Sequence, residues 1–466
     1  MRNWLRLLLL LFVGTAVFAQ EKAPLIKGKV KISIAEGTFD CDLTLSEFPP
    51  LKDYYIRLNS GMNILHFRSK KPNDFVLGFD KSTADSTSTG ESIAYYFPDN
   101  SRKSKFLPEE IQLRYVGKFP VATDTIENYT REDWKGNIAF NGKSVRTDGF
   151  QTCWYPVLYD VAEDRLYSEV RYDIEIECAD CQTLYINGNK PVKSQKTVFQ
   201  SEVPREMTLF CGNFDFTNNN DTYILNPDLS EEQITEFCAL TNSYKAFLSD
   251  RLRLPYNQPV TFVETTPTSK KNGWLFVSYP TIFSIGWGEN GLQSLFNPKI
   301  QNWYRPFIAH ELGHYYFGTY KVFNSELGDM MSEGFSEFLS LKVTQNLIGP
   351  DVYNKKLADK MESLKDFKPI PFSKVKSRSD YKDRELYVYY FAPLVFTAIE
   401  LEIGHELMWK WLNQLLKAKT RFTDYDFLLE TFKKTINNQK AFNALRDMYF
   451  DNDAALENAL KRIGQR

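Results

Sequence analysis

The sequence is poor in histidine and has no excess of charge of either sign. Its 466 residues include four histidines, and its formal net charge is −2 at pH 7. A near-neutral chain offers no basic surface, so we expect no nucleic-acid partner. After the first twenty residues we find no internal repeat and no segment apolar enough to span a membrane. Apolar residues make up 43% and charged residues 25%, as is typical of a globular protein, and the length favours two or three domains.

The first nineteen residues differ from the rest. Arg2 and Arg6 precede an apolar run over residues 7–13, and small residues follow as far as Ala19. This order is typical of a signal peptide, which we predict over residues 1–19. The run is shorter than the roughly 20 residues of a membrane-spanning helix, and no cysteine closely follows it to carry a lipid. The sequence therefore predicts a periplasmic or secreted protein without a membrane span after cleavage.

The six cysteines are an even number, which allows disulfides in an exported chain. Cys178 and Cys181 have the spacing of a redox pair or of half a zinc site. A redox pair favours a helix N-terminus, which lowers a thiol pKa, but strand-like runs lie on both sides of this pair. The pattern therefore favours a structural turn, which a disulfide can close.

Short extended runs fill the first half of the chain. β-branched and aromatic residues are concentrated or alternate in the runs 29–34, 54–59, 64–69, 111–117, 171–177 and 182–187. Gly, Asn, Asp and Pro separate these runs. We predict an all-β domain over residues 20–217, built as a sandwich of antiparallel sheets. The polar residues that follow predict a linker over 218–228.

The remaining residues, 229–466, predict a mainly helical domain with a small sheet. Ser230 and Gln233 form a capping box, and apolar residues then recur at helical spacing. Residues 259–265 and 273–279 have the composition of strands. Most of the chain after them is typical of amphipathic or buried helices.

The motif HELGH contains two of the four histidines. Residues four apart in a helix point in nearly the same direction, so His310 and His314 can both reach one ion. Glu311 borders the same space and can place a base beside a metal-bound water. The alternative is an ordinary solvated helix face, but the pattern is rare enough to favour zinc.

A zinc site of this kind needs a third protein ligand. No further histidine lies near His314, which argues against a three-histidine site. Four downstream carboxylates are candidates, Glu326, Asp329, Glu333 and Glu337. Glu333 starts a predicted helix that can fold back against the first, and Glu337, one turn further, competes with it.

The motif HELGH, followed after eighteen residues by EGFSEF, resembles the signature of the zinc aminopeptidases of alanyl aminopeptidase and leukotriene hydrolase type. These gluzincins carry HExxH and, eighteen residues later, a glutamate. The resemblance implies one zinc ion per chain, held by His310, His314 and Glu333, with Glu311 as general base. It also implies a thermolysin-like catalytic domain after the β domain.

Two further residues follow from the same resemblance. SIGWGENG is similar to the family's GAMEN motif, which implies that Glu289 binds the free α-amine of a peptide, although Trp287 and Gly288 replace the usual residues. The alternative is a glycine-rich turn that ends a strand. The segment from Tyr389 to Gly404 fits the frame of the family's catalytic tyrosine, which implies that Tyr389 stabilises an oxyanion. Tyr387 and Tyr390 are rivals, and a core aromatic is the alternative.

The function that follows is that of a zinc-dependent aminopeptidase, a hydrolase that acts on peptide substrates. A zinc endopeptidase built on the same domain is the first alternative. The second is a binding module whose peptidase domain has lost its activity, because the motifs around Glu289 and Glu333 depart from the family's pattern.

Overall fold

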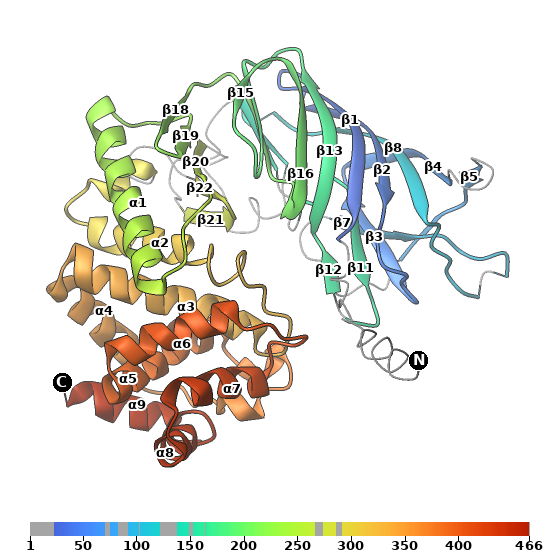
Figure 1. Cartoon of the computed structure of the whole chain (residues 1–466). Helices are drawn as coiled ribbons and strands as arrows, with labels where there is room; N and C mark the ends of the chain where they lie inside the picture. Colours follow the sequence, from blue (N-terminus) through green and yellow to red (C-terminus); the bar gives the residue numbers. More distant parts are fainter. Residues whose placement is uncertain are drawn as a thin grey trace, which may run out of the picture. The chain divides into compact units, whose positions relative to one another are not determined.

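The structure is a computed structural model that describes residues 23–465 apart from 70–74, 83–91, 102, 122–137, 148, 150–151, 164, 266–273 and 286–290. The contacts within the chain divide it into two compact units (Figure 1). The first ends at Asn213 and the second begins at Phe214. The predicted signal peptide and Glu289 lie outside the described residues.

The first unit consists of strands. These are β1 (Leu25–Ser33), β2 (Thr38–Ser46), β3 (Tyr54–Asn59), β4 (Met62–Ser69), β5 (Val76–Leu77), β6 (Asp80–Lys81), β7 (Ser92–Tyr96), β8 (Glu110–Lys118), β9 (Ala139–Phe140), β10 (Ser144–Thr147), β11 (Val157–Asp160), β12 (Arg165–Tyr167), β13 (Glu169–Cys178), β14 (Thr183–Ile186), β15 (Val192–Lys193), β16 (Lys196–Glu206) and β17 (Leu209–Gly212). They form a seven-stranded sheet in the order β16-β13-β1-β2-β8-β4-β5 and two five-stranded sheets, β15-β14-β17-β10-β9 and β12-β11-β3-β7-β6.

The large sheet has one buried face. Every second residue of β8 and β13 is buried, as the period of two along a strand requires when one face packs on a core. The extended runs of the sequence are therefore confirmed as strands. One feature differs from the predicted sandwich of antiparallel sheets, because β1 pairs with β13 in parallel.

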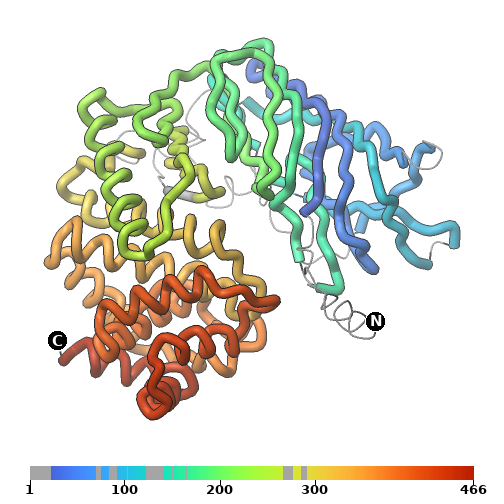
Figure 2. The backbone as a smooth tube through the Cα atoms, in the orientation of Figure 1, coloured from blue at the N-terminus to red at the C-terminus, as the bar shows by residue number. Residues whose placement is uncertain are grey.

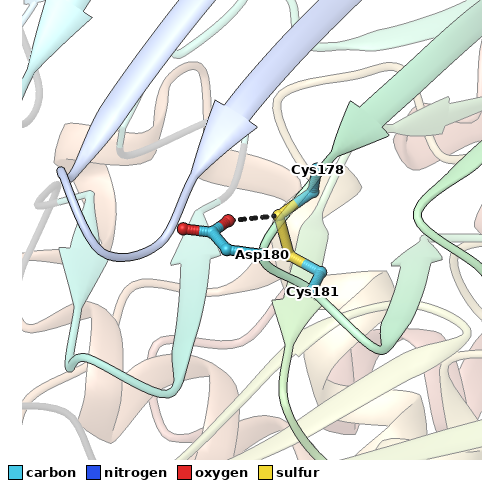
Figure 3. Close-up of side chains that lie close together, drawn as sticks. All are labelled: Cys178, Asp180 and Cys181. Carbon is cyan, nitrogen blue, oxygen red and sulfur yellow. Dashed lines mark hydrogen bonds between the residues drawn. A yellow bond between two sulfur atoms is a disulfide. The ribbon is translucent and has the colours of Figure 1, made fainter.

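Cys178 and Cys181 close the turn between β13 and β14 with a disulfide (Figure 3). Both cysteines are buried, and the predicted structural turn is confirmed. Asp180, between them, accepts hydrogen bonds from the backbone amides of Ile34 and Ala35 and from the hydroxyl of Ser33. The turn thus ties the end of β13 to the turn that follows β1. Since both sulfur atoms are in the disulfide, they are not thiolate ligands for a metal.

The second unit combines a five-stranded sheet with a stack of helices (Figures 1 and 2). Its strands, in the order β18-β19-β20-β22-β21, are β18 (Phe216–Asn219), β19 (Thr222–Leu225), β20 (Val260–Thr265), β21 (Trp274–Ser278) and β22 (Thr281–Ile285). Its helices are α1 (Glu231–Leu252), α2 (Gln301–Gly313), α3 (Gly328–Val343), α4 (Pro350–Ser363), α5 (Ala392–Ile403), α6 (His405–Lys417), α7 (Tyr425–Ile436), α8 (Gln439–Tyr449) and α9 (Ala455–Gly464).

The predicted linker over 218–228 is wrong. Most of it belongs to the hairpin β18–β19, and β19 pairs in parallel with β20 in the sheet of the second unit. Asn220 and Asp221 form the two-residue turn of this hairpin, with φ of 47° and 64°. A tight hairpin turn of this kind needs positive φ at both central residues, which Asn and Asp tolerate. Their polar character therefore marks a turn inside the sheet.

One helical stretch among the described residues, Leu386–Ile403, is long and apolar enough to cross a membrane by length and composition. The sequence predicted no such segment. It consists of a π-helical turn, Leu386–Phe391, followed by α5, and 67% of it is buried inside the fold. It packs against α3 and α9. Its apolar composition therefore fits a central place in the helical core.

Candidate metal centre

Two helices that pack closely together carry the centre. His310 lies in the last turn of α2, and His314 follows the end of this helix. Glu333 lies in the second turn of α3. A Cβ added to Gly313 would lie 3.1 Å from the Cα of Ser336 on α3, closer than ordinary van der Waals contact. The glycine of HELGH thus permits the approach that brings the two histidines beside Glu333.

Three potential ligand atoms meet at one point between the helices. Nε2 of His310 and Nε2 of His314 are 3.2 Å apart, and each lies 3.3 Å from Oε2 of Glu333. Zinc bonds of about 2.0–2.2 Å in tetrahedral geometry place neighbouring ligand atoms about 3.3 Å apart. The triangle therefore has the size that a zinc ion requires.

The hydrogen bonds of the two rings leave lone pairs facing the centre. Nδ1 of His310 lies 2.9 Å from Oε2 of Glu337, and Nδ1 of His314 lies 3.3 Å from the carbonyl oxygen of Phe317 and 3.2 Å from Oγ of Ser336. Because the carboxylate of Glu337 and the carbonyl of Phe317 can only accept, and a hydroxyl can also accept, we assign the proton of each ring, when it is neutral, to Nδ1, which leaves Nε2 as a lone-pair donor for a metal. Oε2 of Glu333 is buried and has no hydrogen-bond donor among the described residues. Three acceptors that converge in this way fit a cation.

The carboxylates around the histidines attract positive charge strongly. Burial lowers the pKa of His310, but its contacts with the carboxylates of Glu333 and Glu337 outweigh burial and raise this pKa to about 10. Burial raises the pKa of Glu333, whereas the charges of His314 and His310 outweigh it and hold the pKa well below its usual range. The same attraction for a proton favours a divalent ion.

Glu337, the rival for the third ligand position, lies on the outer side of His310. Its Oε2 contacts Nδ1 of that ring, while its Oε1 lies 2.7 Å from Nζ of Lys360 and 3.4 Å from Nζ of Lys356. Burial raises the pKa of Glu337, but the two lysines outweigh it and hold the pKa well below its usual range. Glu337 is thus placed to orient His310, and Glu333 is the carboxylate that faces the centre.

Lys360, on α4, joins two parts of the site. Besides contacting Glu337, its Nζ donates a hydrogen bond of 2.7 Å to the backbone carbonyl of Tyr389. Both bonds are shielded from water, because the lysine is 7% exposed. The lysine thereby holds the π-helical turn that carries Tyr389 next to Glu337, which contacts His310. Nothing in the local sequence around Lys360 points to this role.

We expect Lys360→Met to lower the free energy of unfolding by roughly 3 kcal/mol. The substitution breaks a buried charge pair and leaves the negative charge of Glu337 only partly neutralised. Denaturation in urea measures this change. The matched control is Lys356→Met, since Lys356 is more exposed and lies farther from the same oxygen. An equal loss of stability in both variants would contradict this account of Lys360.

Arg384 holds the other oxygen of Glu333. Its guanidinium donates to both oxygens of Asp329 at 2.7 Å and to Oε1 of Glu333 at 3.2 Å. It also lies over the ring of Tyr389, 5.5 Å from the centroid. A bidentate Arg–Asp pair is rigid, so it fixes the carboxylate of Glu333 with Oε2 toward the histidines. Asp329 thus supports the ligand through Arg384, a residue that no motif in the sequence indicated.

Tyr389 is the tyrosine that lies beside the centre. Its ring centroid is 5.6 Å from that of His310. The hydroxyl of Tyr387 donates to the carbonyl of Ile370, and the ring of Tyr390 lies under Lys360. Burial raises the pKa of Tyr389, and the charge of Glu333 raises it further. Its hydroxyl therefore stays protonated at neutral pH and can donate a hydrogen bond.

Glu311 is buried beside the ligand atoms. Its Oε2 lies 4.0 Å from Nε2 of His314. Burial raises the pKa of Glu311 against the opposing charges of the two histidines. A carboxylate with a raised pKa accepts a proton more readily, which suits a general base. The structure thus brings together His310, His314, Glu333, Glu311 and Tyr389 of the predicted residues.

The fold of the chain resembles that of known proteins, although its sequence does not match them. No model of a protein family and no curated protein matches the sequence. Solved structures do match. An M1 zinc metallopeptidase from Deinococcus radiodurans, bound to a Tyr-Ser-Ala substrate, has a TM-score of 0.57 and 14% identity, covering 91% of this chain and 94% of its own. Native leukotriene A4 hydrolase from Saccharomyces cerevisiae has a TM-score of 0.62 and 12% identity, covering 91% and 67%.

The chain has the M1 zinc metallopeptidase fold. The family resemblance of the HELGH motif is thereby confirmed at the level of fold, and so is the fold class, a β-rich unit followed by a mainly helical one. In this M1-type fold α2 and α3 supply the three potential ligands. A second solved structure of the yeast hydrolase holds bestatin, with a TM-score of 0.57, 12% identity and coverage of 90% and 66%.

Proposed function

We propose that this chain is a zinc-dependent peptidase, and more specifically an aminopeptidase that removes N-terminal residues from peptides. The observation that carries the proposal is the triangle of His310, His314 and Glu333 ligand atoms beside the buried carboxylate of Glu311. The matching solved structures, one with a bound peptide substrate and one with bestatin, support peptides as the substrate class.

The residues of the site divide the work of peptide hydrolysis. His310, His314 and Glu333 would hold a zinc ion, which would supply a Lewis acid for the scissile carbonyl and for the attacking water. Glu311 takes the proton of the attacking water and delivers it to the nitrogen of the leaving amine. Tyr389 donates a hydrogen bond to the oxyanion that develops on the carbonyl oxygen.

The aminopeptidase part of the proposal depends on recognition of a free α-amine. We assign this role to Glu289, following the resemblance to the GAMEN motif. A carboxylate that pairs with an ammonium favours a chain end over an internal peptide, because an internal peptide would leave the charge of the carboxylate unpaired.

Acetylation of the substrate's α-amine tests this recognition directly. We expect an unblocked peptide to be hydrolysed from its N-terminus, and the same peptide with an acetylated α-amine to lose roughly 100-fold or more in kcat/KM. Mass spectrometry of the products identifies the bond that is cut. The variant Glu289→Gln should lose most of this discrimination. Internal cleavage of the blocked peptide at an undiminished rate would instead establish an endopeptidase, and zinc binding without turnover of either peptide would favour a binding module.

The proposed location is the periplasm or the exterior of the cell. The order of charged, apolar and small residues in the first nineteen positions supports it, as does the disulfide between Cys178 and Cys181, because such bonds persist in oxidising compartments. N-terminal sequencing of protein recovered from the native host tests it, since cleavage after Ala19 would leave Gln20 as the first residue.

A further inference from the structure

A row of aromatic rings leads along α2 from the exposed Trp303 to the metal centre. Trp303, Phe307 and His310 occupy positions i, i+4 and i+7, which lie on one face of a helix. The rings of Trp303 and Phe307 are 6.0 Å apart at an interplanar angle of 14°. Those of Phe307 and His310 are 6.1 Å apart at 24°. We call Trp303 and Phe307 the aromatic row, which ends against a potential metal ligand.

The aromatic row is not part of the hydrophobic core. Trp303 is 64% exposed, the highest fraction of any large hydrophobic side chain among the described residues. On the opposite face of α2, Ile308, Ala309 and Leu312 are buried in the helical core, which includes neither ring of the row. Trp303 exposes a large ring to water, which is unfavourable, and the half-buried Phe307 continues this apolar surface toward His310, so the row offers a surface to an apolar ligand.

The position of the row limits what can occupy it. A peptide whose scissile carbonyl lies at the centre has the side chains next to that bond within a few ångströms of His310, and therefore close to Phe307. Ring faces bind either another aromatic group or a cation. The apolar surface of the two rings favours the aromatic group, because binding it removes that surface from water.

We propose that Trp303 and Phe307 form a specificity subsite that binds an aromatic side chain of the peptide, next to the bond that is cleaved. This inference rests on the proposed peptidase function and specifies its substrate class. The rings of the row lie nearly parallel to one another and to the ring of His310, so a bound aromatic side chain extends an existing stack.

Steady-state kinetics with a matched peptide set tests the subsite. The set places Phe, Ala or Arg on either side of the cleaved bond. We expect a preference for Phe over Ala at one of the two positions, and Trp303→Ala should lower kcat/KM for that Phe peptide roughly tenfold while leaving the Ala peptide unchanged. Trp303→Tyr should restore most of the preference. The matched control is Phe422→Ala, since Phe422 is also an exposed aromatic, at 50%, and lies outside the row. An unchanged preference in Trp303→Ala, or a preference for Arg, would overturn the proposal.

Calorimetric binding in the Glu311→Gln background separates this inference from the proposed function. Tighter binding of the Phe peptide than of the Ala peptide, lost on adding Trp303→Ala, supports the subsite even if no peptide is hydrolysed by the unmodified chain. Hydrolysis that does not depend on Trp303, together with equal binding of both peptides, rejects the subsite and leaves the peptidase function intact.

Discussion

Replacing Glu311 by glutamine should lower kcat by roughly 10²- to 10⁴-fold and leave zinc binding intact. The amide has nearly the shape of the carboxylate but cannot accept the proton of the attacking water. Glu311 does not complete the ligand triangle, because its nearest oxygen is 4.0 Å from Nε2 of His314, whereas the oxygen of Glu333 is 3.3 Å away. Activity on an unblocked peptide and zinc content by atomic absorption are the two measurements.

The two measurements together distinguish a loss of catalysis from a loss of metal binding. A Glu311→Gln protein that retains one zinc per chain and loses turnover has lost a base. A protein that loses both has lost the centre, and the assignment of Glu311 would then be wrong. Full activity of the variant would reject the proposed mechanism altogether. Thermal unfolding serves as the control for folding, since the buried position of Glu311 makes its neighbours sensitive to substitution.

Glu333→Ala and Glu337→Gln should differ sharply in their effect on zinc. Glu333 offers the oxygen that completes the triangle with the two histidines, so we expect Glu333→Ala to lose zinc at micromolar concentration and to lose measurable activity. Glu337 contacts the outer nitrogen of His310, on the side away from the ligand triangle, so Glu337→Gln should weaken zinc binding by about 10- to 100-fold without abolishing it. Competition with a chelator of known affinity measures both.

The pair of variants also tests the choice between two carboxylates one helical turn apart. If Glu337→Gln abolished zinc binding and Glu333→Ala retained it, the third ligand would be Glu337, and the side-chain geometry of α3 would be wrong.

Removal of metal from the unmodified chain provides the reference. A chelator should abolish turnover, and added zinc should restore it, since the ligand atoms come from two helices that pack through apolar contacts.

Local sequence patterns determined much of the fold. Alternating residues identified β8 and β13, because a strand with one buried face must alternate, and the capping box at Ser230 identified the start of α1. The same kind of evidence failed at residues 218–228. Polar Asn and Asp residues suit both a linker and a tight hairpin turn, and only the pairing of β19 with β20 decides between them.

At the centre, the sequence determined what helical spacing controls, and tertiary packing decided the rest. The four-residue interval sets His310, in the last turn of α2, and His314, directly after that helix, on the same side whatever surrounds them. The choice of Glu333 over Glu337, and of Tyr389 over its neighbouring tyrosines, depends on how α3 and the turn before α5 pack against that face. Lys360 and Arg384 reach the site from other parts of the chain, so no local sequence pattern predicts their roles. Side-chain periodicity follows from one backbone conformation, whereas contacts between helices depend on the packing of the whole core.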